Sequence, residues 1–190
     1  MKSALTALLA ICLCLGFGCT KNPKEFEETA AFAERKAKAE AGNATAQNNL
    51  GTMYALGDGV PQNFKEALKW FRLAAEQGDE VAQNNLGLSY AQGAGVATDD
   101  KEAVKWFRKA AEQGYAEAQF NLGAMYYNGH GVLKNEVTAT TWWAIAAVNG
   151  HQDAKENMGA ITKEMTPEQI AKAQELSSEM IKKNPKLINE

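Results

Sequence analysis

The chain has 190 residues, of which 45% are hydrophobic and 23% charged, which suits a soluble domain or one short array of repeats. Its formal net charge is −3 and it has no lysine- or arginine-rich stripe, which argues against nucleic acid as a partner. The three cysteines are Cys12, Cys14 and Cys19, so the rest of the chain offers no disulfide or thiolate chemistry.

Residues 1–18 are predicted to be a signal peptide rather than part of the fold. Lys2 provides a short positive segment, and residues 4–18 form an apolar run that is short for a membrane span. Small residues flank Phe17 in the sequence GFGC, so cleavage is expected just before Cys19. No second apolar run follows.

This segment resembles a bacterial lipoprotein signal, in which the cysteine is lipidated and becomes the first mature residue. The resemblance implies that Cys19 is the lipidation site, that residues 19–23 hold the lipid and a polar tether, and that the protein reaches the membrane through this lipid. It departs from the usual signal at Gly16, where leucine is common. Thr20, in place of aspartate, favours the outer membrane. The alternative is ordinary cleavage at the same place, which leaves a free thiol.

Beyond the tether, the sequence repeats every 36 residues. The hexapeptide AQNNLG at 46–51 and 82–87 returns as AQFNLG at 118–123. Such a period is the signature of a repeat architecture and predicts three full units. The units are 44–79, 80–115 and 116–151.

The first part of each unit predicts an amphipathic helix. Ala46, Leu50 and Tyr54 are spaced i, i+4, i+8 and form one apolar stripe, and the later units keep the pattern. Gly51 lies beside that stripe, and glycine in a helix costs about 0.5–1 kcal/mol relative to alanine. Because each unit keeps this glycine, we expect a second helix to approach closely there.

A glycine-containing loop and a second helix complete each unit. Asn63, Asp99 and Asn135 are expected N-caps, and Glu66 and Glu102 are expected to complete capping boxes in the first two units. The second helices alternate large aromatics with alanines, which favours close packing. Glycines in left-handed conformation are expected to end them: Gly78, Gly114 and Gly150.

The segment AQNNLGTMYALGDGVPQNFKEALKWFRLAAEQG (46–78) resembles the Sel-1-like repeat, a relative of the tetratricopeptide repeat, and the resemblance covers 44–151. It implies an all-α fold, a right-handed α-α superhelical solenoid of antiparallel helix pairs. It also implies protein–protein scaffolding, with no general catalytic residues.

The flanks fit capping elements. Residues 24–43 are predicted to form an N-terminal capping helix, in which Glu34 and Arg35 replace the Trp-Phe pair of the repeats. Residues 152–190 are predicted to form a partial repeat and a C-terminal capping helix. That helix should open at Thr166 with a capping box completed by Gln169 and run to about Lys183.

No residue pattern indicates a metal, a cofactor or catalysis. His130 and His151 do not recur between units and belong to no ligand motif, so they are read as exposed loop residues. A cysteine-rich branch of the family is associated with β-lactam binding or hydrolysis, but this chain lacks those cysteines. A cell-wall or β-lactam-related hydrolase or binder therefore remains the alternative to a non-enzyme.

The candidate partner-binding residues lie opposite the core stripe of the first helices. The third unit has aromatics where the first two have small or polar side chains, and exposed aromatics are common interface anchors. The candidates are Asn84, Leu88, Phe120 and Tyr127. The alternative for Phe120 and Tyr127 is packing under the closing helices. Asn85 and its copies are expected to hydrogen-bond neighbouring backbone.

Together these observations predict a non-catalytic adaptor of the bacterial cell envelope, exported to the periplasmic side and anchored in the outer membrane. Its partner would be another envelope protein. A weaker alternative is a secreted factor that acts on a host.

Overall fold

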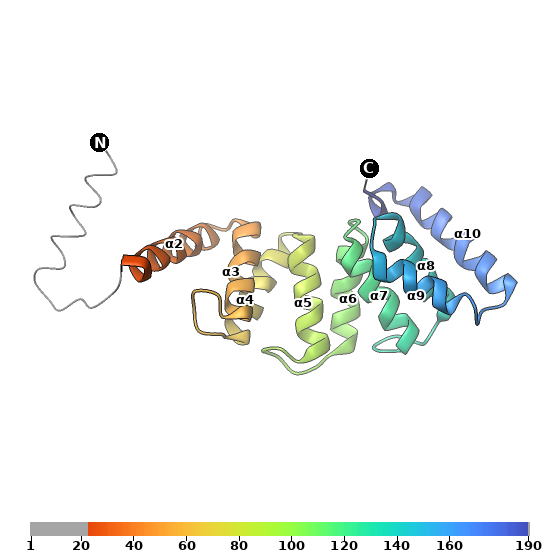
Figure 1. Cartoon of the computed structure of the whole chain (residues 1–190), viewed down its shortest axis with the longest axis horizontal. Helices are drawn as coiled ribbons and strands as arrows, with labels where there is room; N and C mark the ends of the chain where they lie inside the picture. Colours follow the sequence, from red (N-terminus) through yellow and green to blue (C-terminus); the bar gives the residue numbers. More distant parts are fainter. Residues whose placement is uncertain (1–22, 190) are drawn as a thin grey trace, which may run out of the picture.

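The computed structural model describes residues 23–189, and all regular secondary structure in that range is helical. The helices pack against their neighbours in chain order and form one elongated array, seen in Figure 1. They are α2 (Pro23–Glu40), α3 (Ala44–Leu56), α4 (Phe64–Glu76), α5 (Glu80–Gln92), α6 (Asp100–Ala111), α7 (Ala116–Asn128), α8 (Glu136–Val148), α9 (Gln152–Ile161), α10 (Pro167–Lys183) and the short 3-10 helix η1 (Pro185–Leu187). The expected all-α solenoid is confirmed. Each of the three repeats contributes one helix pair, α3–α4, α5–α6 and α7–α8.

The second helix of each pair begins at the expected cap. The side chains of Asn63, Asp99 and Asn135 accept hydrogen bonds from backbone N–H groups in the first turns of α4, α6 and α8. The capping boxes expected from Glu66 and Glu102 are wrong. The N-cap backbone N–H groups donate instead to carbonyls of the preceding helices, as Asn63 N does to Tyr54 O at 2.8 Å. Glu66 and Glu102 are therefore left to pair with lysines one turn along their own helices.

The glycine inside each first helix lets the aromatic side chain of its partner helix approach the backbone. A Cβ atom at Gly51 or Gly87 would lie 2.7 Å from the ring of Phe71 or Phe107. At Gly123 it would lie 2.5 Å from the Trp143 ring. The expected close approach is therefore confirmed in all three repeats, whereas Gly159 in α9 faces open space.

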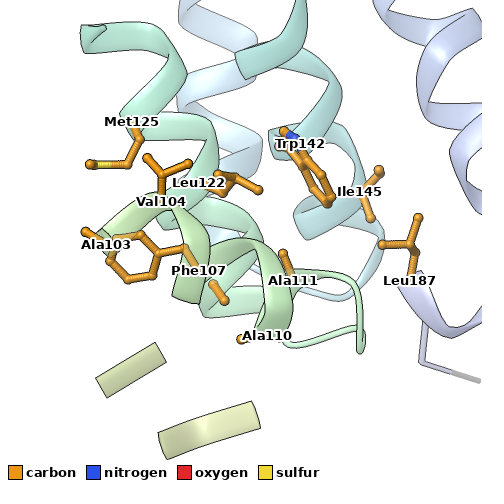
Figure 2. Close-up of a cluster of buried hydrophobic side chains, with 11 residues drawn as sticks. Ala103, Val104, Phe107, Ala110, Ala111, Leu122, Met125, Trp142, Ile145 and Leu187 are labelled. Atoms are coloured by element: carbon orange, nitrogen blue, oxygen red, sulfur yellow. The ribbon is translucent and has the colours of Figure 1, made fainter. Parts of the chain in front are cut away.

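Buried side chains of adjacent repeats form a series of clusters along the array. Figure 2 shows the cluster that joins the second and third repeats, in which Phe107 of α6 and Leu122 of α7 lie together with Trp142 of α8. Alanines such as Ala110 and Ala111 fill the close contacts between these larger groups.

The last helix folds back on the array. Thr166 and Gln169 form the expected capping box, and α10 ends at Lys183 as expected. It packs along α8 and buries Ala173, and the chain then returns to the α6–α7 turn. There Leu187 is 2% exposed and joins the cluster of Figure 2. The sequence predicted this stretch only as part of the C-terminal cap, without this contact.

Candidate protein-binding surface

Asparagine side chains connect the first helices of successive repeats. Asn85 Nδ2 donates to Asn48 Oδ1 at 2.9 Å, and Asn121 Nδ2 donates to Asn84 Oδ1 at 3.0 Å. Asn48 and Asn84 are 7% and 3% exposed, so these bonds lie between the repeats rather than on the surface. The structural role expected for Asn85 is confirmed, but its partner is a side chain and not the backbone.

The placement of Asn84 corrects one expectation. We predicted that its side chain faces outward because it lies opposite the core stripe in the register. In the folded chain the next repeat covers it, and its Oδ1 already accepts the bond from Asn121. A side chain held in this way offers no surface to a partner.

In the third repeat, Phe120 occupies the register of Asn48 and Asn84. Its ring stacks on His151 with centroids 4.5 Å apart and an interplanar angle of 16°. Its carbonyl oxygen accepts a hydrogen bond from Trp143 Nε1 at 3.1 Å, and the side chain packs against the cluster below α9. This placement corresponds to the packing alternative for Phe120.

His151 is not an exposed loop residue, as the sequence suggested, but the N-cap of α9. Its Nδ1 accepts from Ala154 N at 3.3 Å, and its Nε2 lies 3.0 Å from Glu117 Oε2. This pair of contacts suits the tautomer that carries the proton on Nε2. The ring therefore holds α9 against α7.

Tyr127 keeps more of its surface than Phe120. It is 38% exposed, and its ring lies 5.6 Å from that of Trp143. Lys134 Nζ lies 5.4 Å from the centroid of the Tyr127 ring. A hydrogen bond and the charge of Glu136 raise the pKa of Lys134 and so favour the cation over this ring.

Two hollows open between first helices of successive units. The first hollow, about 310 Å³, lies between the first and second repeats. Its lining residues come from α3, α4, α5 and the loop after α5: Thr52, Ala55, Leu56, Phe64, Ala67, Phe71, Asn85, Leu88, Ser89, Gln92 and Ala94. The second hollow, about 270 Å³, lies between the third repeat and α9 and is lined by Ala124, Tyr127, Asn128, Trp143, Asn157, Ala160, Ile161 and Glu164.

Every residue of the second hollow occupies the register of a residue of the first, two repeats further along the chain. Leu88 lines the first hollow and Tyr127 the second. Neither hollow contains Asn84 or Phe120. Two of the four predicted residues therefore line hollows of the same type, but not the same hollow.

Leu56 and Phe64, both in the first hollow, were missed. They are 72% and 43% exposed. A comparison of the repeats by register could have found them, because the later repeats carry Gln92 and Asn128 in place of Leu56. Phe64 is likewise replaced by acidic residues, so the first repeat is unusually apolar at these exposed positions.

The chemistry of the first hollow suits binding of apolar side chains. No charged side chain is among the residues that line the first hollow, where amide and hydroxyl groups of Asn85, Gln92 and Thr52 stand beside apolar groups. Such a surface can bury an apolar side chain and hydrogen-bond the peptide backbone on either side.

Among residues 32–189, whose side chains the structure describes, no cluster of three or more histidine, cysteine or acidic side chains could hold a metal ion. No helix in this described part is both long and apolar enough to cross a membrane. Cys19 and the predicted signal peptide lie outside the described residues.

The Sel1 repeat profile matches residues 6–25, 44–79, 81–115 and 116–151. A protective antigen with an SLR fold, present in uropathogenic Escherichia coli strains, is 39% identical over 95% of this chain, with a TM-score of 0.77. The match covers 38% of that protein, so this chain spans well under half of its length. A Sel1 repeat protein from Oxalobacter formigenes is 39% identical, with a TM-score of 0.62, over 68% of this chain and 98% of that one. A search of curated proteins gives no match.

Proposed function

Since this chain belongs to the Sel1 repeat family, whose members generally mediate protein–protein interactions, we propose that it is an adaptor that holds a partner protein through its two hollows. The partner would be another protein of the bacterial cell envelope. The observation that carries this proposal is the first hollow, with its exposed Leu56 and Phe64 beside uncharged polar groups.

The partner segment would place an apolar side chain against Leu56, Phe64 and Leu88. A second contact would form at Tyr127. Exposed aromatic and aliphatic side chains that become buried on binding supply much of the affinity of an interface. Hydrogen bonds from Asn85 and Gln92 to the backbone of the segment would set its direction.

Anchoring at Cys19 completes the proposal. Lipidation there would hold the solenoid on the periplasmic side of the outer membrane, with residues 20–23 as a tether. In support, residues 4–18 have the length and composition of a signal peptide. The similar protein from Escherichia coli is described as a protective antigen, which agrees with export.

Sel1 repeat proteins are typically non-catalytic scaffolds, and we propose the same of this chain. The alternative of a β-lactam-related hydrolase or binder is tested by incubating the purified protein with a chromogenic β-lactam. Sustained turnover would make it an enzyme.

The adaptor proposal is tested by capture of envelope proteins with the wild-type chain and a Leu56→Ser/Phe64→Ser variant. Leu133→Ser is a matched control, because Leu133 is 90% exposed and lines neither hollow. We expect the double variant to lose at least about tenfold of the captured partner, since two apolar contacts are removed, and the control to keep it. Equal capture by all three proteins would exclude the first hollow.

A further inference from the structure

The segment of residues 184–189, which follows α10, lies across the α6–α7 turn and the end of α8. Its one buried side chain is that of Leu187, which lies beside Ile145 in Figure 2 and belongs to the cluster that also contains Ala111. Ile188 is partly buried against the same cluster, whereas Pro185, Lys186 and Asn189 are exposed. The segment is thus held by a single deep anchor.

Hydrogen bonds fix the backbone of this segment at the anchor and just after it. Leu187 O accepts from Gln119 Nε2 at 2.8 Å and from Asn149 Nδ2 at 2.7 Å. Asn189 N donates to Asn149 Oδ1 at 2.8 Å, so Asn149 contacts the segment through both atoms of its amide.

Two further bonds use the side chains of the segment. Asn184 Nδ2 donates to Glu112 O at 2.8 Å, and Asn189 Nδ2 lies 3.3 Å from Gly114 O. An apolar pocket flanked by donors and acceptors for peptide groups is an arrangement by which proteins recognise a short peptide.

The chain builds this place differently from its equivalent one repeat earlier. There Gln113 occupies the register of Asn149, and both amides lie near the carbonyl of the preceding turn glycine, Gln113 Nε2 at 3.1 Å from Gly78 O and Asn149 Nδ2 at 3.3 Å from Gly114 O. Lys109 occupies the register of Ile145. The apolar Ile145 therefore provides an apolar surface for a leucine, and Asn149 Nδ2 faces Leu187 O as well as Gly114 O. Gln119, which is 0% exposed, supplies the second donor.

We propose that this notch, formed by Ala111, Gly114, Gln119, Ile145 and Asn149, is a peptide-binding site whose resident ligand is the 184–189 segment. A partner segment of the same chemistry displaces it: a short helical turn that ends in a leucine, followed by an extended branched aliphatic residue and an amide side chain. The site lies apart from both hollows and does not depend on their function.

Displacement is favoured by the balance of forces on the segment. One buried leucine and a few hydrogen bonds must offset the conformational entropy of six ordered residues, and these opposing contributions are similar in size. Moreover, α10 has its own contacts with α8, where Ala173 is 1% exposed. The segment can therefore leave while α10 stays in place.

The test uses a fluorescent peptide with the sequence NPKLIN, residues 184–189, and the full chain. Anisotropy is measured with the wild type and with Leu187→Asp, which weakens the resident segment. Only molecules whose resident segment has left can bind the peptide, so the apparent Kd of the wild type is the intrinsic Kd divided by the open fraction. If about a tenth of the molecules or fewer are open, the variant should bind at least about tenfold more tightly. Adding Ile145→Lys to this variant, or replacing the leucine of the peptide by aspartate, should abolish binding. Equal affinity for wild type and variant, or no saturable binding to a variant with wild-type circular dichroism, overturns the proposal.

A second measurement does not depend on the variant folding. The same peptide, with photoleucine in place of its leucine, is crosslinked to the wild-type chain and the sites are mapped by mass spectrometry. We expect crosslinks to residues 108–119 and 141–149, competed by unlabelled peptide and absent with a scrambled one. The proposal is contradicted if crosslinks are spread over all repeats, or if the peptide gives no more crosslinks than the scrambled one.

Discussion

Asn85 donates a hydrogen bond from Nδ2 to the Oδ1 of Asn48, one repeat earlier, at 2.9 Å. The same bond joins Asn121 to Asn84. The recurring asparagines of AQNNLG thus connect repeats through pairs of side-chain amides in a partly buried place. Where Phe120 replaces the acceptor, the contact becomes an aromatic stack on His151.

Replacing Asn85 by alanine should lower the free energy of unfolding by about 1–3 kcal/mol, because the buried Oδ1 of Asn48 loses its donor. Partner capture should fall by less than the roughly tenfold expected of Leu56→Ser/Phe64→Ser, because the apolar contacts of the first hollow remain. Urea denaturation followed by circular dichroism measures the stability. Asn49→Ala is the matched control, since Asn49 has the same register in the first repeat and is exposed. If the control costs as much as Asn85→Ala, the side-chain pair is not the cause.

Gly87→Ala should destabilise the chain by about 1–3 kcal/mol, because the new Cβ would lie 2.7 Å from the buried Phe107 ring. Gly159→Ala should instead raise stability by about 0.5–1 kcal/mol, since that helical glycine faces open space. Thermal unfolding of both variants checks the opposite signs. A neutral Gly87→Ala would mean that the helix pairs are looser than the structure indicates.

Replacing Phe120 and Tyr127 by alanine should have different effects on stability. Phe120→Ala removes a packed ring and its stack on His151 and should cost about 2 kcal/mol or more in stability. Tyr127→Ala should cost less than about 1 kcal/mol, since the side chain is more exposed. Chemical denaturation and partner capture are measured on each. A strong loss of capture from Phe120→Ala with unchanged stability would restore the surface interpretation of that residue.

Cys19→Ser should release the protein from membranes if Cys19 carries the lipid. Several acyl chains on one residue give stable anchoring, whereas a serine gives none. Membrane fractionation and the intact mass of the mature protein check this. A variant with the wild-type mass and membrane fraction would rule out lipidation at Cys19.

The helix pairs followed from the sequence because their causes are local. A stripe such as Ala46, Leu50 and Tyr54, a cap such as Asn63 and a turn glycine such as Gly78 act within a few residues, and the 36-residue period confirms each signal. The capping boxes failed for a reason outside the local sequence. The N-cap N–H of Asn63 finds Tyr54 O in the preceding helix, so no group remains for Glu66 to cap.

The candidate surface could be predicted only in part. Leu88 and Tyr127 line hollows, but Asn84 is covered by the next repeat and Phe120 by α9. One helical register cannot tell a face that meets solvent from one that meets a neighbouring helix, because both lie opposite the same core stripe. Leu56 and Phe64 differ from their register equivalents in the sequence, and the structure shows that both are exposed and line one hollow.

By itself, the sequence determined the repeat, its helix pairs and the close contacts at glycines such as Gly51. These features recur every 36 residues, and each 36-residue unit corresponds to one helix pair. The tertiary structure alone decided where the 184–189 segment goes. The backbone of Leu187 bonds to Gln119, 68 residues earlier in the chain, and the 36-residue repeat does not predict that contact. It forms because α10 turns back along α8 and carries one leucine to a place where Ile145 provides an apolar surface and Asn149 a hydrogen-bond donor.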